Sequence, residues 1–146
     1  MSRFSKRFDA AAVTLNFYYK ARAECNLDSL IDLWVDEEFA CWVDENGIQH
    51  YGIENIRNGL NNQIRKNGPV TITALDIHAY NSLSTVIYAI VETHANEHGE
   101  KMVFSTYVLV LERSEWRIAH LHVSIMPPEA ANIFLEKLRH ARGPLH

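Results

Sequence analysis

The sequence predicts a single α+β domain in which helices cover one face of a sheet. Two patterns indicate this class. Segments before residue 68 carry apolar residues at helical spacing, whereas the stretch from Val70 to Ile125 alternates with a period of two through four successive segments. Helices followed by a run of strands are typical of α+β domains, and 146 residues are enough to bury one hydrophobic core.

Two helices are expected near the N-terminus. Residues 7–25 contain neither Gly nor Pro, and Phe8, Ala12, Leu15 and Tyr19 lie on one helical stripe. A second, short helix is expected over residues 28–34, with Asp28 as its N-cap.

A short hairpin and a long helix follow. Residues 39–44 are typical of a strand, 45–47 of a turn, and 48–51 of a brief extended segment. The next helix is marked by four apolar residues at helical spacing: Ile53, Ile56, Leu60 and Ile64. Asn67-Gly68-Pro69 ends it, because Gly accepts a left-handed cap and Pro cannot continue a helix.

Four strands and a last helix complete the chain. The strands are expected over residues 70–80, 85–95, 102–113 and 116–125, with turns at 81–84, 96–100 and 114–115. Pro127-Pro128-Glu129 opens the last helix, since Pro fits the first helical turn, and Gly143-Pro144 ends it. We expect residues 127–146 to extend the domain that residues 1–126 form.

The last strand carries His120 and His122 on one face, and Ala119, Leu121 and Val123 on the other. A tight turn at Ser114-Glu115 would place Tyr107 opposite His122. One sheet face then collects Tyr88, Glu92, His94, Ser105, Tyr107, His120, His122 and Ser124. The other face collects Ala89, Val91, Thr93, Phe104, Thr106, Val108, Val110, Ala119, Leu121 and Val123.

The second, more aliphatic face is expected under the helices, because apolar helix stripes must lie on apolar surface. This assignment depends on register, since a slip of one residue exchanges the faces of a whole strand. The first face would then lie outside, where its aromatic residues suit a homodimer contact. The expected interface residues are Tyr88, Glu92, Ser105, Tyr107, His120, His122 and Ser124.

Metal binding by the two histidines is the alternative to this interface. His120 and His122 would need a third ligand, which Glu92 or His94 could supply from the same face. Because that face is expected outside the pocket, we favour a hydrogen-bonded or interface role and predict neither a metal nor a cofactor.

Charge, apolar run length and cysteine pattern limit the classes of protein to which this chain can belong. A net charge of −4 argues against nucleic-acid binding, and no apolar run reaches membrane-spanning length. Cys25 and Cys41 form no metal or disulfide pattern, which favours a reduced cytoplasmic compartment. Residues 2–7 are similar to the start of a signal peptide, but the apolar run that follows is short, so export is not expected.

Three segments resemble the nuclear transport factor 2-like, or SnoaL-like, superfamily. They are residues 33–39 (LWVDEEF), 44–56 (DENG, then YGIENI) and 115–124 (EWRIAHLHVS). The last is similar to the closing strand of SnoaL-like proteins and of the calcium/calmodulin-dependent kinase II association domain. The resemblance spans residues 8–124. It implies a cone-shaped, strongly bent sheet whose concave face and helices enclose one pocket, usually in a dimer.

The resemblance also implies candidate catalytic residues. Ketosteroid-isomerase-like members of the superfamily use a tyrosine on the first helix, where Tyr18 stands, and two pocket carboxylates. Trp42 and Val110 occupy the carboxylate positions, so that particular chemistry is not supported. Asp44 could replace the base or simply close its turn, and His78, beside Asp76, could act as a base or form an exposed pair. The candidates are Tyr18, Asp44 and His78.

The pocket implied by this fold is mostly apolar. Its expected lining is Tyr18, Trp34, Trp42, Thr93, Phe104, Thr106, Val108, Arg117, Ala119, Leu121 and Val123. We expect a small apolar ligand and, for an enzyme, isomerisation, dehydration or cyclisation without a cofactor, with Tyr18 donating to a developing oxyanion. A non-catalytic dimerisation module and the small subunit of a ring-hydroxylating oxygenase are the alternatives.

Overall fold

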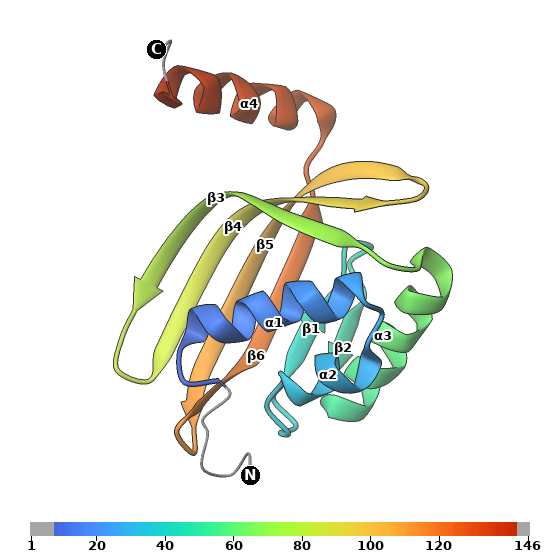
Figure 1. Ribbon diagram of the computed structural model, residues 1–146, viewed down its shortest axis with the longest axis vertical. Helices are drawn as coiled ribbons and strands as arrows, with labels where there is room; N and C mark the ends of the chain where they lie inside the picture. Colours follow the sequence, from blue (N-terminus) through green and yellow to red (C-terminus); the bar gives the residue numbers. More distant parts are fainter. Residues whose placement is uncertain (1–7, 143–146) are drawn as a thin grey trace.

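A computed structural model describes residues 8–142 and confirms the predicted α+β class (Figure 1). The elements in chain order are α1 (Ala11–Ala23), α2 (Leu27–Asp32), β1 (Cys41–Val43), β2 (Gln49–Tyr51), α3 (Ile53–Asn67), β3 (Thr71–Asn81), β4 (Thr85–Asn96), β5 (Gly99–Glu112), β6 (Glu115–Ile125) and α4 (Pro128–Arg142). The predicted end of the last helix, Gly143-Pro144, lies outside the described residues.

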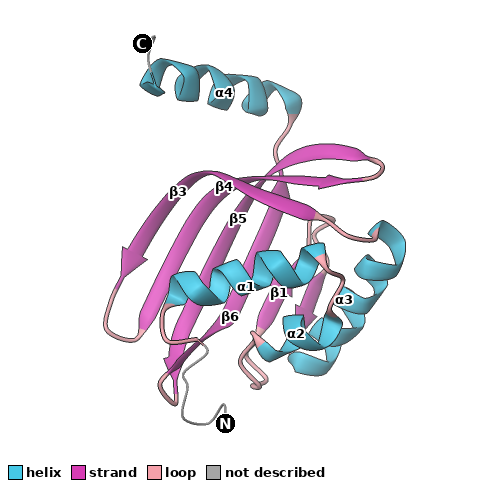
Figure 2. Cartoon of the chain, viewed as in Figure 1, coloured by secondary structure: helices cyan, strands magenta, loops and turns pink. Residues whose placement is uncertain are grey.

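The six strands form one curled, mixed sheet in the order β2-β1-β6-β5-β4-β3. Strand β1 runs parallel to β6, and every other neighbouring pair is antiparallel. Figure 2 shows α1 lying across the concave face, with α2 and α3 beside it. The predicted packing of the N-terminal helices on the concave face is therefore confirmed.

The helix ends follow local chemistry. Asn26, and not Asp28 as predicted, caps α2, because its side-chain oxygen accepts a hydrogen bond from the backbone N–H of Ser29. Helix α3 ends as expected at Gly68, whose φ of 68° suits a residue without a Cβ.

The buried stripe of α1 differs slightly from the predicted one. Ala11, Leu15, Tyr18 and Arg22 face the sheet, whereas Ala12 is exposed and Tyr19 is only partly buried. The core between helices and sheet is completed by large buried side chains: Leu30, Leu33, Trp34, Ile56, Leu60, Tyr107, Leu109, Ile118 and Leu121.

The hairpin between β5 and β6 explains an error in the predicted faces. Arg113 and Ser114 form its turn, both with positive φ, as in the two-residue turns that match sheet twist. Leu109 then pairs with Ile118, but Val108 pairs with His120, so Ala119 is an extra residue in β6. This β-bulge inverts the alternation of β6 relative to β5 beyond that point.

As a result, Tyr107 pairs with Leu121 and Ser105 with Val123, not with His122 and Ser124 as predicted. The outer-face assignment of Glu92, Ser105 and Tyr107 was wrong, because all three are buried on the concave side. Tyr88, also assigned outside, packs against the core there.

The reverse error affects the residues expected under the helices. Thr93, Phe104, Thr106 and Val108 lie on the convex face, and Phe104 is 48% exposed. The predicted orientation of β6 itself is right: Ala119, Leu121 and Val123 are buried, whereas His122 and Ser124 are exposed on the outside.

Helix α4 stands clear of the sheet in Figure 1, and none of its described side chains is buried. Ile133 and Leu135 are exposed apolar residues on this helix. None of the helices in residues 8–142 combines the length and the apolar character needed to cross a membrane.

Candidate functional site

A cavity of about 330 Å³ opens between α1, the C-terminal end of α3 and the turn joining β4 to β5. Its lining is Tyr18, Arg22, Trp42, Glu45, Gln63, Asn67, Val70, Ile72, His94, Asn96, His98, Gly99, Glu100, Lys101 and Val123. Only Tyr18, Trp42 and Val123 were predicted to line a pocket. The wall carries more polar and charged groups than the apolar pocket expected from the sequence.

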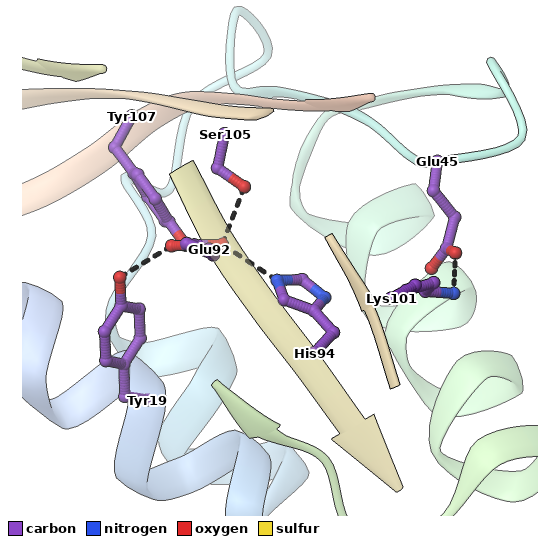
Figure 3. A network of polar contacts seen from close by, with 7 residues as sticks. All are labelled: Tyr19, Glu45, Glu92, His94, Lys101, Ser105 and Tyr107. Carbon is purple, nitrogen blue, oxygen red and sulfur yellow. Dashed lines mark hydrogen bonds and ion pairs between the residues drawn. The ribbon is translucent and has the colours of Figure 1, made fainter. Parts of the chain in front are cut away.

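Beneath this cavity, Glu92 of β4 is fully buried at the centre of a polar network (Figure 3). Its Oε2 accepts hydrogen bonds from the hydroxyls of Tyr19 and Tyr107, at 2.6 and 2.7 Å. Its Oε1 accepts one from Ser105 Oγ at 2.7 Å and contacts His94 Nε2 at 2.8 Å. A carboxylate has about four acceptor positions, so this one is fully used.

The network keeps Glu92 ionised. Burial acts to raise the pKa of its carboxyl group, but the hydrogen bonds from His94, Tyr19, Ser105 and Tyr107 together lower the pKa below its ordinary value. Conversely, burial and the negative charge of Glu92 raise the pKa of both Tyr19 and Tyr107. The two tyrosines therefore stay protonated and donate to the carboxylate.

His94 connects this buried charge to the cavity. It lies two residues after Glu92 on β4, its side chain is 15% exposed, and it forms part of the cavity wall. The contact with Glu92 holds Nε2, while Nδ1 has no hydrogen-bond partner among residues 8–142. A histidine oriented by a carboxylate, with its other nitrogen unoccupied, can accept and return a proton.

Tyr18 contributes a hydroxyl to the same cavity. Its ring packs edge-on against Tyr107, with 5.7 Å between centroids, and burial raises its pKa. Whereas Tyr19 and Tyr107 donate to Glu92, the Tyr18 hydroxyl has no such partner among the described residues. It is thus available to donate to a ligand.

The other two candidate catalytic residues lie elsewhere. Asp44 closes its turn, accepting from the backbone N–H groups of Asn46 and Ile48, and it pairs with His50 at 3.0 Å. Burial acts to raise the pKa of Asp44, but these bonds lower it. Of the two roles expected for Asp44, the structure agrees with the turn residue: Oδ1 is held in the turn, Oδ2 contacts His50, and the side chain is not among those that line the cavity.

His78 also takes the second of its two expected roles, the exposed pair. It forms the expected pair with Asp76 at 3.0 Å, but the pair lies on edge strand β3 with the His78 side chain 78% exposed. Of Tyr18, Asp44 and His78, only Tyr18 reaches the cavity.

Several predicted pocket residues belong to the core or the surface. Trp34, Ala119 and Leu121 are packed in the hydrophobic core, and Thr93, Phe104, Thr106 and Val108 face outward. Arg117 pairs with Glu115 and Asp32 and stacks on Phe8, away from the cavity.

The two histidines of β6 lie on the outer face, with ring centroids 6.4 Å apart. Burial and the neighbouring His122 lower the pKa of His120. Glu92 and His94, considered above as further ligands, lie on the opposite face of the sheet. Residues 8–142 contain no group of three or more His, Cys, Asp or Glu side chains suited to a metal.

Sequence reasoning missed Arg22, Lys101 and the role of Glu92 with His94. One signal was available: Glu92 is a charged residue within an apolar strand, two positions from a histidine, and such a residue needs several partners when buried. The cation of Lys101 pairs with Glu45 (Figure 3), and both residues line the cavity.

Known proteins share the sequence family and the fold of this chain. The sequence model of the SnoaL-like domain family matches residues 12–128, whereas a search of curated proteins gives no significant match. A solved structure assigned as a calcium/calmodulin-dependent protein kinase type II association domain, from Thiobacillus denitrificans, superposes with a TM-score of 0.75 at 17% identity, covering 82% of this chain and 98% of that one.

Two other solved structures have the same fold. A protein assigned as a dehydratase of the nuclear transport factor 2-like family, from Streptomyces avermitilis, gives a TM-score of 0.74 at 14% identity over 80% of this chain and 94% of that one. An uncharacterised cystatin-like-fold protein from Caulobacter vibrioides gives 0.73 at 17% identity over 86% and 93%. These identities establish the fold alone, and they confirm the fold family expected from the sequence.

Proposed function

The chain belongs to the SnoaL-like domain family, and on this premise we propose that it binds a small molecule in the cavity beneath α1 and transforms it by general acid/base catalysis. One observation carries the proposal: a fully buried, ionised Glu92 orients His94, whose other ring nitrogen is unoccupied at the cavity wall. Buried charge costs free energy, and its placement beside a titratable cavity residue is typical of catalytic sites.

In the proposed reaction, His94 Nδ1 removes a proton from a carbon next to a carbonyl group. The electron pair moves to the carbonyl oxygen, where Tyr18 donates a hydrogen bond to the oxyanion. Glu92 stabilises the imidazolium ion that forms. Return of the proton from His94 to another carbon completes an isomerisation. In a dehydration, the His94 imidazolium gives that proton to the β-hydroxyl group, which leaves as water while the enolate electrons form the new carbon–carbon double bond.

The likeness to the Streptomyces avermitilis protein, itself assigned as a dehydratase, agrees with such chemistry. The SnoaL-like family includes small-molecule-binding and dehydratase-like proteins. For this chain we propose isomerase or lyase activity that requires no cofactor.

The test measures the first chemical step directly. Purified protein is incubated in D₂O with a panel of ketones, 3-oxo acids and 3-hydroxy acids, and deuterium incorporation next to the carbonyl group or loss of water is followed by NMR. The wild type is expected to accelerate at least one of these reactions, and His94→Gln to slow it by about 10²–10⁴-fold.

His78→Gln is the matched control, because this exposed histidine also pairs with a carboxylate but lies on the edge strand. It should retain full activity. No reaction with any member of the panel, or equal activity of His94→Gln and the wild type, would refute the proposed chemistry.

An assembly module is the second candidate, and a specific observation favours it. The convex face exposes Phe104 beside Ser124 and His122, and α4 leaves Ile133 and Leu135 uncovered. The likeness to a structure assigned as a kinase association domain agrees with a homodimer formed through this face. A large exposed apolar surface is typical of such contacts.

Light scattering tests this interface. His122→Glu adds one carboxylate to each copy. Two copies that meet on the convex face would bring these two negative charges together, so the variant should convert a dimer into a monomer. Glu38→Gln, on an exposed loop, is the control. An unchanged dimer of His122→Glu would exclude the contact. The oxygenase-subunit alternative stays a prediction, and purification of the chain alone as a stable dimer would count against it.

A further inference from the structure

Arg22 is a buried cation without an ionic partner. It lies in the last turn of α1, is 4% exposed, and donates one hydrogen bond, from Nη1 to the carbonyl oxygen of Gly68 at 2.8 Å. Within residues 8–142, no carboxylate oxygen lies within ion-pairing distance of its guanidinium group. Buried arginines are normally paired, so this one is an exception that needs an explanation.

The carboxylates around the cavity do not supply the missing partner. All the acceptor positions of Glu92 are taken by Tyr19, Tyr107, Ser105 and His94. Glu45 pairs with Lys101, and Glu100 is exposed. The positive charge of Arg22 is therefore available to a ligand that enters the cavity.

A guanidinium group has five N–H donors in a fixed plane, and Gly68 uses one of them. Arg22 forms part of the cavity wall and is covered on its other sides. We propose that Arg22 is a ligand-binding residue, whose free N–H donors hold the carboxylate of a small organic acid in the cavity. This inference rests on the proposed function and specifies the substrate class.

The same arrangement orients the acid for the proposed reaction. Arg22 and Tyr18 lie one helical turn apart on α1, and both line the cavity with His94. A carboxylate bound at Arg22 leaves the remainder of the molecule beside the tyrosine and the histidine. A cavity of about 330 Å³ is at the small end of ligand sites, so the acid is a small one.

A binding assay tests the charge recognition without requiring turnover. The probes are carboxylates paired with their neutral amides: butanoate to octanoate, benzoate and phenylacetate, with phenyl phosphate as a further anion. Affinity is measured by isothermal titration calorimetry with the wild type, Arg22→Gln and Lys101→Gln. Lys101 is the matched control, because it is also a cavity cation but already has Glu45 as its partner.

At least one carboxylate should bind the wild type about 10- to 100-fold more tightly than its amide, since hydrogen bonds to charged groups are the stronger ones. Arg22→Gln should lose this preference while amide binding changes little, and Lys101→Gln should keep it. A purely structural Arg22, tying α1 to the end of α3, would instead weaken acid and amide equally.

Three results would overturn the inference: no carboxylate preferred over its amide, a preference that survives in Arg22→Gln, or tighter binding of phenyl phosphate than of phenylacetate. The outcome is separable from the proposed catalysis. His94→Gln should retain the carboxylate preference, so an acid that binds but is not turned over would refute the catalytic proposal alone.

Discussion

Replacing Glu92 with Gln tests the buried network most directly. The side chain keeps its shape, and its amide can accept from Tyr19 and Tyr107 through oxygen while donating to Ser105 and His94. The four contacts at 2.6–2.8 Å therefore survive as neutral hydrogen bonds. Bonds to a charged group contribute about 1 kcal/mol more each than neutral ones, and the lower desolvation of an amide offsets part of this. We expect a net loss of about 2 kcal/mol in the free energy of unfolding at pH 7.

The pH dependence has a definite sign. The pKa of Glu92 in the folded protein is lowered from its ordinary value of 4.5. Its contribution to stability is therefore fully present above pH 4.5 and is lost as the pH falls through the folded-state pKa. The gap between wild type and Glu92→Gln in the free energy of unfolding should therefore shrink as the pH falls below 4.5.

Urea denaturation followed by tryptophan fluorescence, at several pH values and one protein concentration, measures this gap. Glu38→Gln, on the surface, should match the wild type throughout. The reasoning fails if Glu92→Gln equals the wild type at pH 7, or if the gap is the same at pH 3 as at pH 7.

Three further predictions concern local geometry. Gly59→Ala should lower the free energy of unfolding by about 1–3 kcal/mol, and with it Tm, because the new Cβ would lie 2.6 Å from a ring carbon of His50. A higher Tm would contradict this packing. The double variant Arg113→Asn with Ser114→Gly should raise stability by about 1 kcal/mol in urea titrations, since both positions have positive φ; no gain would argue against the turn type. In the same assay, Asn26→Ala should lower the free energy of unfolding by about 1 kcal/mol and Asp28→Ala by much less, because Asn26 caps α2. A larger loss for Asp28→Ala would indicate that Asp28 is the cap.

The elements were predictable because each depends on local patterns. The apolar repeat from Ile53 to Ile64 and the Gly68 cap define α3, and the period-two alternation defines the four long strands within a few residues. The parallel pairing of β1 with β6 was not predicted from the residues, because strand order depends on contacts between segments far apart in the chain.

It was harder to predict which residues share a sheet face and which residues form the site, for a physical reason. Alternation places residues on two faces but does not say how neighbouring strands align, and the single extra residue Ala119 inverted the alignment of β5 with β6. The sequence favours an outer position for Glu92, because apolar helix stripes need the aliphatic face and a buried polar group without partners is costly. Its burial depends on four donors from α1, β4 and β5, which only the folded chain brings together.

The bulge at Ala119 also matters for anyone who wishes to redesign this protein. In an unbroken strand, every second side chain faces the same interior. Substitutions made there to fit a ligand would therefore also alter the packing of the whole core. In β6, Ile118 is the inward residue before the bulge and Ala119, Leu121 and Val123 are the inward residues after it. Only Val123 reaches the cavity. A library built at that position, with Ile118 and the bulge left untouched, can vary the ligand site while the packing under α1 stays as it is.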